Sequence, residues 1–146
     1  MKNLLVLFGG VSPEHEVSLR SAEFVLGHID QSKYNVYAVG ITKEGKWKYY
    51  PSQDYAAIRE NHWQEAEGVC DAALSPSRGQ GLLILKPQGL EIVPMDCCFP
   101  VLHGENGEDG SIQGLMQVAG VPCVGPGVTA SASCMDKTMT KLVVGE

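Results

Sequence analysis

Apolar residues in the first third of the chain follow a strand pattern and then a helix pattern. A continuous apolar run at residues 3–8 ends at Gly9-Gly10, which predicts a strand buried on both faces of a parallel sheet. Apolar side chains then recur every three or four positions from Leu19 to Ile29, which predicts an amphipathic helix. A second β-rich run follows at residues 36–41. These segments together predict one βαβ unit at the start of the chain.

The middle of the chain has two hairpin patterns. Lys43-Glu44-Gly45 separates residues 36–42 from 47–50, and Gly89 separates residues 82–86 from 90–93, so both places predict antiparallel pairs. Between them, residues 55–81 mix polar and small side chains with weak periodicity. We interpret this stretch as a peripheral insert.

Alternation of strand and helix patterns resumes in the last third. A β-rich run at residues 96–102 ends in a glycine-rich acidic loop, and the next helix pattern, at 111–119, stops at Gly120. Residues 121–124 predict a short strand, and residues 128–132 and 135–144 predict helices. The chain is therefore expected to be an α/β domain with three Rossmann-like layers, a central and mostly parallel sheet, and a peripheral insert containing a β-hairpin.

Composition and charge narrow the class of protein. Of 146 residues, 44% are hydrophobic and 19% are charged, which favours a globular fold. The net charge is −6 and the basic residues are scattered, which argues against nucleic-acid binding. The longest apolar run is far shorter than the roughly 20 residues of a membrane span. Five cysteines without a Cys-x-x-Cys pair favour a reducing, cytoplasmic location, where we expect them to act as small apolar side chains.

The sequence matches two nucleotide-binding motifs only in part. The glycine and lysine spacing from Gly40 to Lys46 matches a P-loop, but Trp47 stands where Ser or Thr would hold Mg²⁺, and a hairpin is predicted where a helix should begin. The dinucleotide fingerprint fails because no further glycine follows Gly9-Gly10 before Arg20. A nicotinamide-dependent oxidoreductase is therefore disfavoured.

Three loops carry candidate chemistry. Glu14 follows the first strand, where ligands bind in open parallel sheets, and its carboxylate suits an ammonium group or else complements the following helix dipole. His103 follows another strand and either orients a substrate or serves the structure. One histidine beside Glu108 and Asp109 lacks metal-ligand spacing, so no metal site is predicted. Lys137 near a helix start either contacts a phosphate or is a surface lysine.

In order and spacing, these loops resemble the amino-terminal region of D-alanine–D-alanine ligases, most closely the synthetase A and vancomycin-resistance type. The resemblance rests on Phe8-Gly9-Gly10-Val11-Ser12-Pro13-Glu14-His15-Glu16-Val17-Ser18, on Phe99-Pro100-Val101-Leu102-His103-Gly104 with Gly107-Glu108-Asp109-Gly110 and Ile112-Gln113-Gly114, and on Val124-Gly125 with Met135-Asp136-Lys137.

The resemblance implies an ATP-grasp ligase with ATP and Mg²⁺ as cofactors. Such an enzyme phosphorylates the carboxylate of one D-alanine and joins the acyl phosphate to the amine of a second, making the D-Ala-D-Ala dipeptide for peptidoglycan. Carried onto this chain, the resemblance gives Glu14 and His103 catalytic roles, assigns Glu14, Val17, Ser18 and His103 to substrate binding, and assigns Lys137 to ATP.

The resemblance also implies how the chain is divided. Residues 1–128 are expected to form a pre-ATP-grasp substrate domain with an insert at about 43–93, and residues 129–146 to begin an ATP-grasp region that is truncated here. We expect this chain alone to be inactive, the complete ligase to be a homodimer through this domain, and neither nucleic acid nor membrane to be bound. Two alternatives remain: a stand-alone amino-acid-binding module, and a ligase that joins D-alanine to D-serine or D-lactate.

Overall fold

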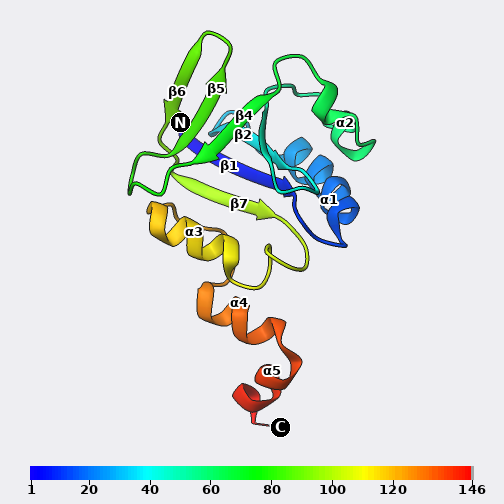
Figure 1. Ribbon diagram of the computed structural model, residues 1–146, viewed down its shortest axis with the longest axis vertical. Helices are drawn as coiled ribbons and strands as arrows, with labels where there is room; N and C mark the ends of the chain where they lie inside the picture. The colour runs from blue at the N-terminus through cyan, green and yellow to red at the C-terminus, as the bar shows by residue number, and fades with distance from the viewer. Residues whose placement is uncertain (146) are drawn as a thin grey trace.

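The computed structural model describes residues 1–145 as a mixed sheet with helices on both faces (Figure 1). The strands are β1 (Lys2–Gly9), β2 (Tyr34–Ile41), β3 (Trp47–Tyr50), β4 (Cys70–Leu74), β5 (Leu82–Lys86), β6 (Gly89–Val93) and β7 (Cys97–Val101). The helices are α1 (His15–His28), α2 (Ala56–Arg59), α3 (Ser111–Ala119), α4 (Val128–Met135) and α5 (Lys137–Val144), with a 3₁₀ turn at Trp63–Glu65.

The strand order is β6-β5-β4-β3-β2-β1-β7. β1 runs parallel to β2 and β7, whereas each of the other four neighbouring pairs is antiparallel. The predicted α/β class and both hairpins are confirmed. The prediction of a mostly parallel sheet is wrong, because the hairpins within residues 43–93 extend the same sheet instead of packing beside it.

The two faces of β1 explain its unbroken apolar run. Alternate side chains of a strand point to opposite faces. Leu5 and Leu7 belong to the core that includes α3, whereas Val6 and Phe8 belong to the core that includes α1. With a helix layer on each face, β1 has no position that faces solvent along its centre, and the predicted three-layer arrangement is confirmed (Figure 1).

The segment at 55–81 is less peripheral than its sequence suggests. Ile58 and Trp63 are fully buried in the α1-side core, and the Trp63 ring lies edge-on to Phe8 with centroids 5.0 Å apart. Before β4, the segment contains only a four-residue helix and a 3₁₀ turn, which are too short to show a helical period. The spacing of apolar residues therefore did not predict that this segment contributes to the core.

Gly40 makes room for Trp63, and we expect Gly40→Ala to lower the free energy of unfolding by about 1–3 kcal/mol, as overpacked cores do. A Cβ at Gly40 would lie 2.4 Å from the Trp63 ring and 2.8 Å from the Phe8 ring. Gly27→Ala is the matched control, because nothing lies within 4 Å of a Cβ at that exposed helical position. Urea denaturation of both variants tests this; equal stabilities would contradict the tight fit.

The last predicted strand is reduced to one residue pair. Residues 121–124 do not form a strand; Cys98 and Cys123 form an isolated parallel bridge. Pro122 cannot donate to a ladder, which limits the pairing. The two following helices are confirmed, with their break at Asp136, whose carboxylate accepts hydrogen bonds from the N–H groups of Thr138 (2.8 Å) and Met139 (3.0 Å).

The final helices extend away from the sheet (Figure 1), and none of the α5 residues is buried. Across residues 1–145, the helices are all too short or too polar to span a membrane.

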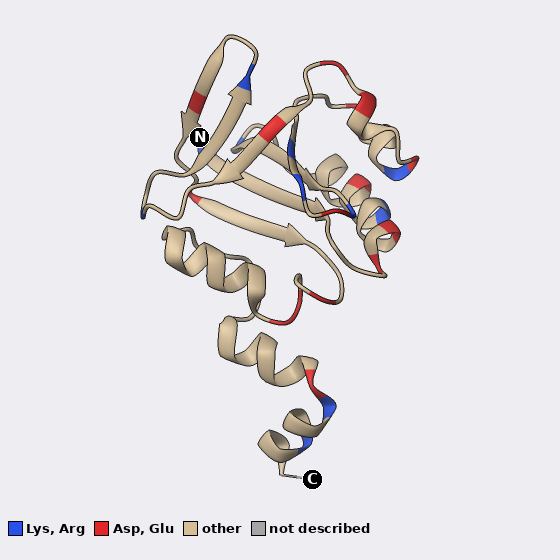
Figure 2. Ribbon diagram, viewed as in Figure 1, with Lys and Arg blue, Asp and Glu red and all other residues tan. Residues whose placement is uncertain are grey.

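Lys and Arg are spread over several elements, whereas acidic residues recur in the loop between β7 and α3 (Figure 2).

Candidate functional site

The turn between β1 and α1 requires glycine. Gly9 and Gly10 have φ angles of +85° and +98°, and a Cβ at Gly9 would lie 2.2 Å from the Ile41 carbonyl oxygen. The Gly10 N–H donates to that same oxygen at 2.8 Å. This close approach places the start of α1 directly over the carboxyl ends of β1 and β2.

Two buried polar side chains of α1 hold the turn in place. His15 Nδ1 lies 2.7 Å from the Gly10 carbonyl oxygen, and the ring is almost completely buried. Ser18 Oγ accepts from the Gly9 N–H at 2.8 Å and donates to the Val101 carbonyl oxygen. Ser18 therefore connects the ends of β1 and β7 from inside the fold.

The burial of Ser18 argues against its expected role in direct substrate contact. Its exposed fraction is 0%, and its hydroxyl already donates and accepts. What the structure shows for Ser18 is a link between the ends of β1 and β7. The resemblance could not distinguish these roles, because a motif position does not reveal which face of a helix it occupies.

We expect Ser18→Ala to lower the free energy of unfolding by about 1–3 kcal/mol, the usual cost of leaving buried polar groups without partners. Ser21→Ala is the control, because Ser21 is only partly buried and its hydroxyl contacts one imidazole. Thermal denaturation compares the two variants. A smaller loss for Ser18→Ala than for Ser21→Ala would show that the Ser18 hydroxyl does not hold the strand ends together.

Glu14 is an exposed carboxylate positioned against the second candidate loop. Ser12 Oγ accepts from the Glu14 N–H at 3.1 Å and donates to the His103 carbonyl oxygen at 2.8 Å, which joins the two loops. A Cβ at Gly104 would lie 2.5 Å from a carboxylate oxygen of Glu14, so that side chain lies directly against the Gly104 backbone. Asn106 Nδ2 adds a second link by donating to the Val11 carbonyl oxygen at 3.1 Å.

The His103 ring is oriented by two neighbours. Its Nε2 lies 3.0 Å from Ser21 Oγ on α1, and its Nδ1 lies 4.0 Å from a carboxylate oxygen of Glu108. The other oxygen of Glu108 accepts from the Gly104 N–H at 2.7 Å. With its side chain about one-third exposed (32%), His103 is both accessible and fixed in orientation.

The acidic loop itself is held by Asp109. Although burial acts to raise the pKa of Asp109, hydrogen bonds from the N–H groups of Asn106 (2.9 Å) and Ser111 (3.0 Å) leave it below its usual value. Asp109 is thus committed to shaping the loop. Among residues 1–145, no group of three or more His, Cys, Asp or Glu side chains is arranged to hold a metal ion.

A cleft of about 400 Å³ opens between these loops at the carboxyl ends of β1, β2 and β7. Its walls include Gly10, Val11, His103 and Asn106, and Ile112 and Leu115 of α3 contribute apolar surface. β2 lies on one side of β1 and β7 on the other, so the cleft is at the switch point where open α/β sheets bind ligands.

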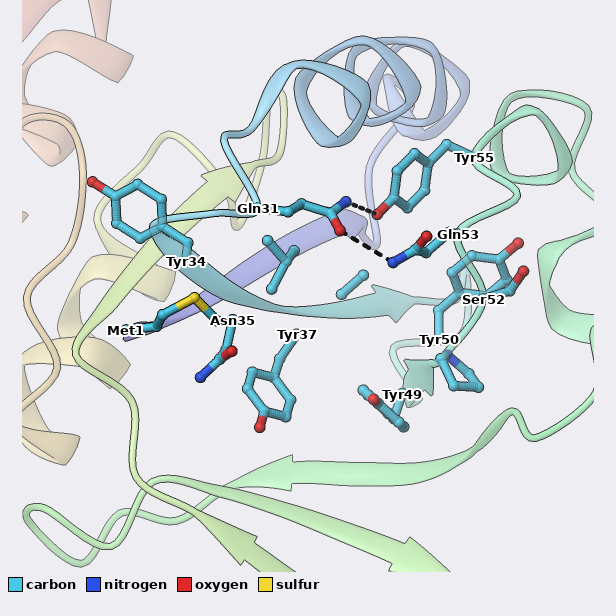
Figure 3. A pocket seen from close by; sticks show the side chains of 13 residues that line it. Met1, Gln31, Tyr34, Asn35, Tyr37, Tyr49, Tyr50, Ser52, Gln53 and Tyr55 are labelled. Atoms are coloured by element: carbon cyan, nitrogen blue, oxygen red, sulfur yellow. Dashed lines mark hydrogen bonds between the residues drawn. The ribbon is translucent and has the colours of Figure 1, made fainter.

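The opposite end of the sheet is chemically different. A hollow of about 490 Å³ there is lined by the start of β2 and the end of β3. Its side chains are mainly tyrosines and amides: Gln31 Nε2 donates to the Tyr55 hydroxyl at 3.2 Å, and Gln53 Nε2 donates to Gln31 Oε1 at 3.1 Å (Figure 3). The lining has no acidic, basic or histidine side chain, whereas the cleft at the other end is lined by His103 and Glu105.

The structure therefore brings some predicted residues together and separates others. Glu14 and His103 meet at Gly104, and Val17 is exposed (42%) on the first turn of α1. Lys137 is exposed at the start of α5, a helix that lies away from the sheet (Figure 1). Sequence reasoning missed the orienting roles of His15 and Ser21. Their signal was the three-residue spacing of His15, Ser18 and Ser21, which places all three near one helix face.

Comparison with known proteins identifies the family of the chain. The family model described as "D-ala D-ala ligase N-terminus" matches residues 3–126. The chain belongs to this family. A D-alanine–D-alanine ligase from Thermoanaerobacter sp. (strain X514) is 44% identical over 145 residues, and one from Clostridium novyi (strain NT) is 46% identical over 146 residues.

Solved ligase structures have the same fold. The VanG D-Ala:D-Ser ligase from Enterococcus faecalis superposes with a TM-score of 0.90 at 40% identity, covering 99% of this chain and 41% of that one. The D-alanine–D-alanine ligase from Coxiella burnetii gives 0.85 at 30% identity, covering 99% and 40%. The alignments with the two bacterial relatives cover 99% and 98% of this chain but 40% and 38% of those proteins. The chain thus spans about two fifths of the length of the relatives that it matches.

Proposed function

We propose that residues 1–128 form the domain that binds the first D-alanine of an ATP-dependent D-alanine–D-alanine ligase, and that residues 129–146 begin its ATP-grasp region. The observation that carries this proposal is the exposed Glu14 carboxylate, which lies against Gly104, next to His103 in the wall of the switch-point cleft. A carboxylate near a partly apolar cleft suits the ammonium and methyl groups of a small amino acid.

Each residue then has a distinct task. Glu14 anchors the ammonium of the first D-alanine. The carboxylate of this D-alanine is then directed out of the cleft, toward the rest of the proposed ligase. His103, oriented by Ser21, borders the same subsite. Val17 provides exposed apolar surface on the first turn of α1, and Ser18 keeps the two loops in register from inside the fold. Such positioning favours reaction by reducing the entropy that the reactants must lose.

ATP and Mg²⁺ are the cofactors we propose for the complete enzyme. ATP would supply the phosphoryl group that activates the D-alanine carboxylate. The exposed Lys137 ammonium fits a contact with a phosphate. Because no metal-ligand cluster occurs within residues 1–145, we place the Mg²⁺ ligands outside this part of the protein. We also propose a cytoplasmic location, where the dipeptide is supplied to peptidoglycan synthesis.

The activity is tested by comparing the 146-residue chain with the complete protein that contains it. We expect the complete protein to release ADP and form D-Ala-D-Ala from ATP and D-alanine, and the chain alone to form none. D-serine and D-lactate are offered as alternative acceptors, because one structural neighbour is named a D-Ala:D-Ser ligase. Dipeptide formation by the chain alone, or no ligation with any acceptor by the complete protein, would refute the proposal.

We propose in addition that this domain contributes to a homodimer of the complete ligase. Phe24 is 66% exposed on α1 and stacks on His28 with ring centroids 4.2 Å apart, which places an aromatic pair on the outer surface. Light scattering of the complete protein and its Phe24→Asp variant tests this surface. We expect a dimer that dissociates in the variant; an unchanged oligomeric state would exclude the α1 surface from the interface.

A further inference from the structure

Cys98, near the start of β7, and Cys123, after α3, are neighbours in the structure. Cys98 in β7 donates its N–H to the Pro122 carbonyl oxygen at 2.8 Å, and the Val124 N–H donates to the Cys98 carbonyl oxygen at 2.8 Å. Cys98 and Cys123 are thereby the paired residues of a parallel bridge. Paired residues have side chains on the same face. The spacing between neighbouring strands, about 4.8 Å, lies within the range of about 4.4–6.8 Å that disulfides span between Cα atoms.

The two thiols differ in accessibility and acidity. Cys98 is fully buried, whereas Cys123 is partly exposed. A side-chain hydrogen bond between them lowers the pKa of Cys123, and the same hydrogen bond, together with burial, raises the pKa of Cys98. Since the thiolate is the reactive form of cysteine, an oxidant from solvent reacts first with Cys123.

We propose that Cys98 and Cys123 form a reversible disulfide when the protein meets a hydroperoxide. The Cys123 thiolate attacks one peroxide oxygen and becomes a sulfenic acid, with the other oxygen leaving as hydroxide. The Cys98 sulfur then attacks the sulfenic sulfur, and the hydroxyl group leaves as water with the thiol proton. In sum, the two thiols lose two protons and two electrons, and hydrogen peroxide becomes two molecules of water.

The disulfide would close a loop that contains the acidic segment after β7 and all of α3. His103 and Glu108 both lie within that loop. Because the bridge already fixes both backbones, the cross-link requires side-chain adjustment without a change of strand register. A cross-link of this kind reduces the freedom of the unfolded chain, so we expect the oxidised protein to have the higher Tm.

The other cysteines provide matched controls. Cys97 adjoins Cys98 in sequence, but it packs with the α1-side core, whereas Cys98 packs with the α3-side core. Cys134 is exposed on α4. Substitution of either Cys97 or Cys134 by alanine should leave the cross-link intact.

The experiment treats the 146-residue chain with hydrogen peroxide, blocks free thiols with N-ethylmaleimide and maps the peptides by mass spectrometry. Cleavage after Glu105 and Glu108 separates Cys98 from Cys123. We expect a linked pair of peptides in the wild type and in the Cys97→Ala/Cys134→Ala variant, reversal by dithiothreitol, and a rise in Tm that is lost on reduction. Cys123→Ala should abolish the cross-link.

Because Cys98→Ala disturbs the core, the double Cys97→Ala/Cys134→Ala variant is the decisive sample. In it, Cys98 and Cys123 are the only cysteines that the linked peptides contain. A sulfinic acid at Cys123 without a cross-link, a vicinal bond between Cys97 and Cys98 in the wild type, or complete blocking of both thiols after peroxide would each overturn the proposal.

Discussion

Glu14→Gln in the complete ligase is expected to raise the KM for the first D-alanine by about 10- to 100-fold. The substitution keeps the shape of the side chain but replaces a carboxylate with a neutral amide, and a hydrogen bond to a charged group contributes about 1.5–3 kcal/mol. Ser12 binds the backbone N–H of Glu14, and only the carboxylate lies against Gly104, so the variant should lose affinity without losing the loop arrangement. Initial rates measured at two ranges of D-alanine concentration distinguish the KM for the first D-alanine from the KM for the second.

Glu16→Gln is the matched control for Glu14→Gln. Glu16 is also at the start of α1 and exposed, but its carboxylate forms a salt bridge with Lys43, which lowers its pKa. Exposed salt bridges contribute little to stability. Glu16→Gln should therefore leave KM unchanged. If the two variants behave alike, Glu14 merely complements the dipole of α1, as the alternative from sequence held.

Trp63→Ala is expected to lower the free energy of unfolding by about 3–5 kcal/mol, the range for deleting a large buried aromatic side chain. The ring is fully buried, packs edge-on against Phe8 and fills the space above Gly40. The Trp63 indole Nε1 has no hydrogen-bond partner within residues 1–145, so its contribution is apolar. Urea denaturation of the 146-residue chain measures the loss.

Trp63→Phe separates packing from polarity. Phenylalanine keeps an aromatic ring but has no N–H, so it should recover a large part of the stability that alanine loses. Trp47, which is only partly buried at the start of β3, serves as a control site for replacement by alanine. A Trp63→Ala variant as stable as Trp47→Ala would mean that the segment at 55–81 is peripheral after all.

Local patterns predicted the elements well, because each depends on neighbouring residues. The apolar run of β1, the helical spacing of α1 and the Gly89 hairpin are of this kind. The position of the hairpins in the sheet depends on pairings between segments that no short turn connects, such as Tyr49 with Cys70 in the β3–β4 pair. No periodicity encodes such pairings, and this is why the sheet was expected to be mostly parallel.

The candidate site was predictable to the extent that strand ends are predictable. Glu14 follows β1, and His103 follows β7, which is a parallel neighbour of β1. The fold therefore brings the two loops to the same edge of the sheet. The contact of Glu14 with Gly104 and the link through Ser12 depend on side-chain directions that spacing does not fix. Burial of Ser18 was hidden for the same reason, since adjacent helix positions differ in the face they present.

The most direct test of a first-D-alanine subsite in this domain is a crystal structure of the complete ligase with D-alanine bound. The ammonium of the first D-alanine should lie within about 3 Å of the Glu14 carboxylate, as a charge-assisted hydrogen bond requires, with His103 beside it. D-alanine held at its ammonium by another residue, with Glu14 still turned against Gly104, would contradict the proposed subsite.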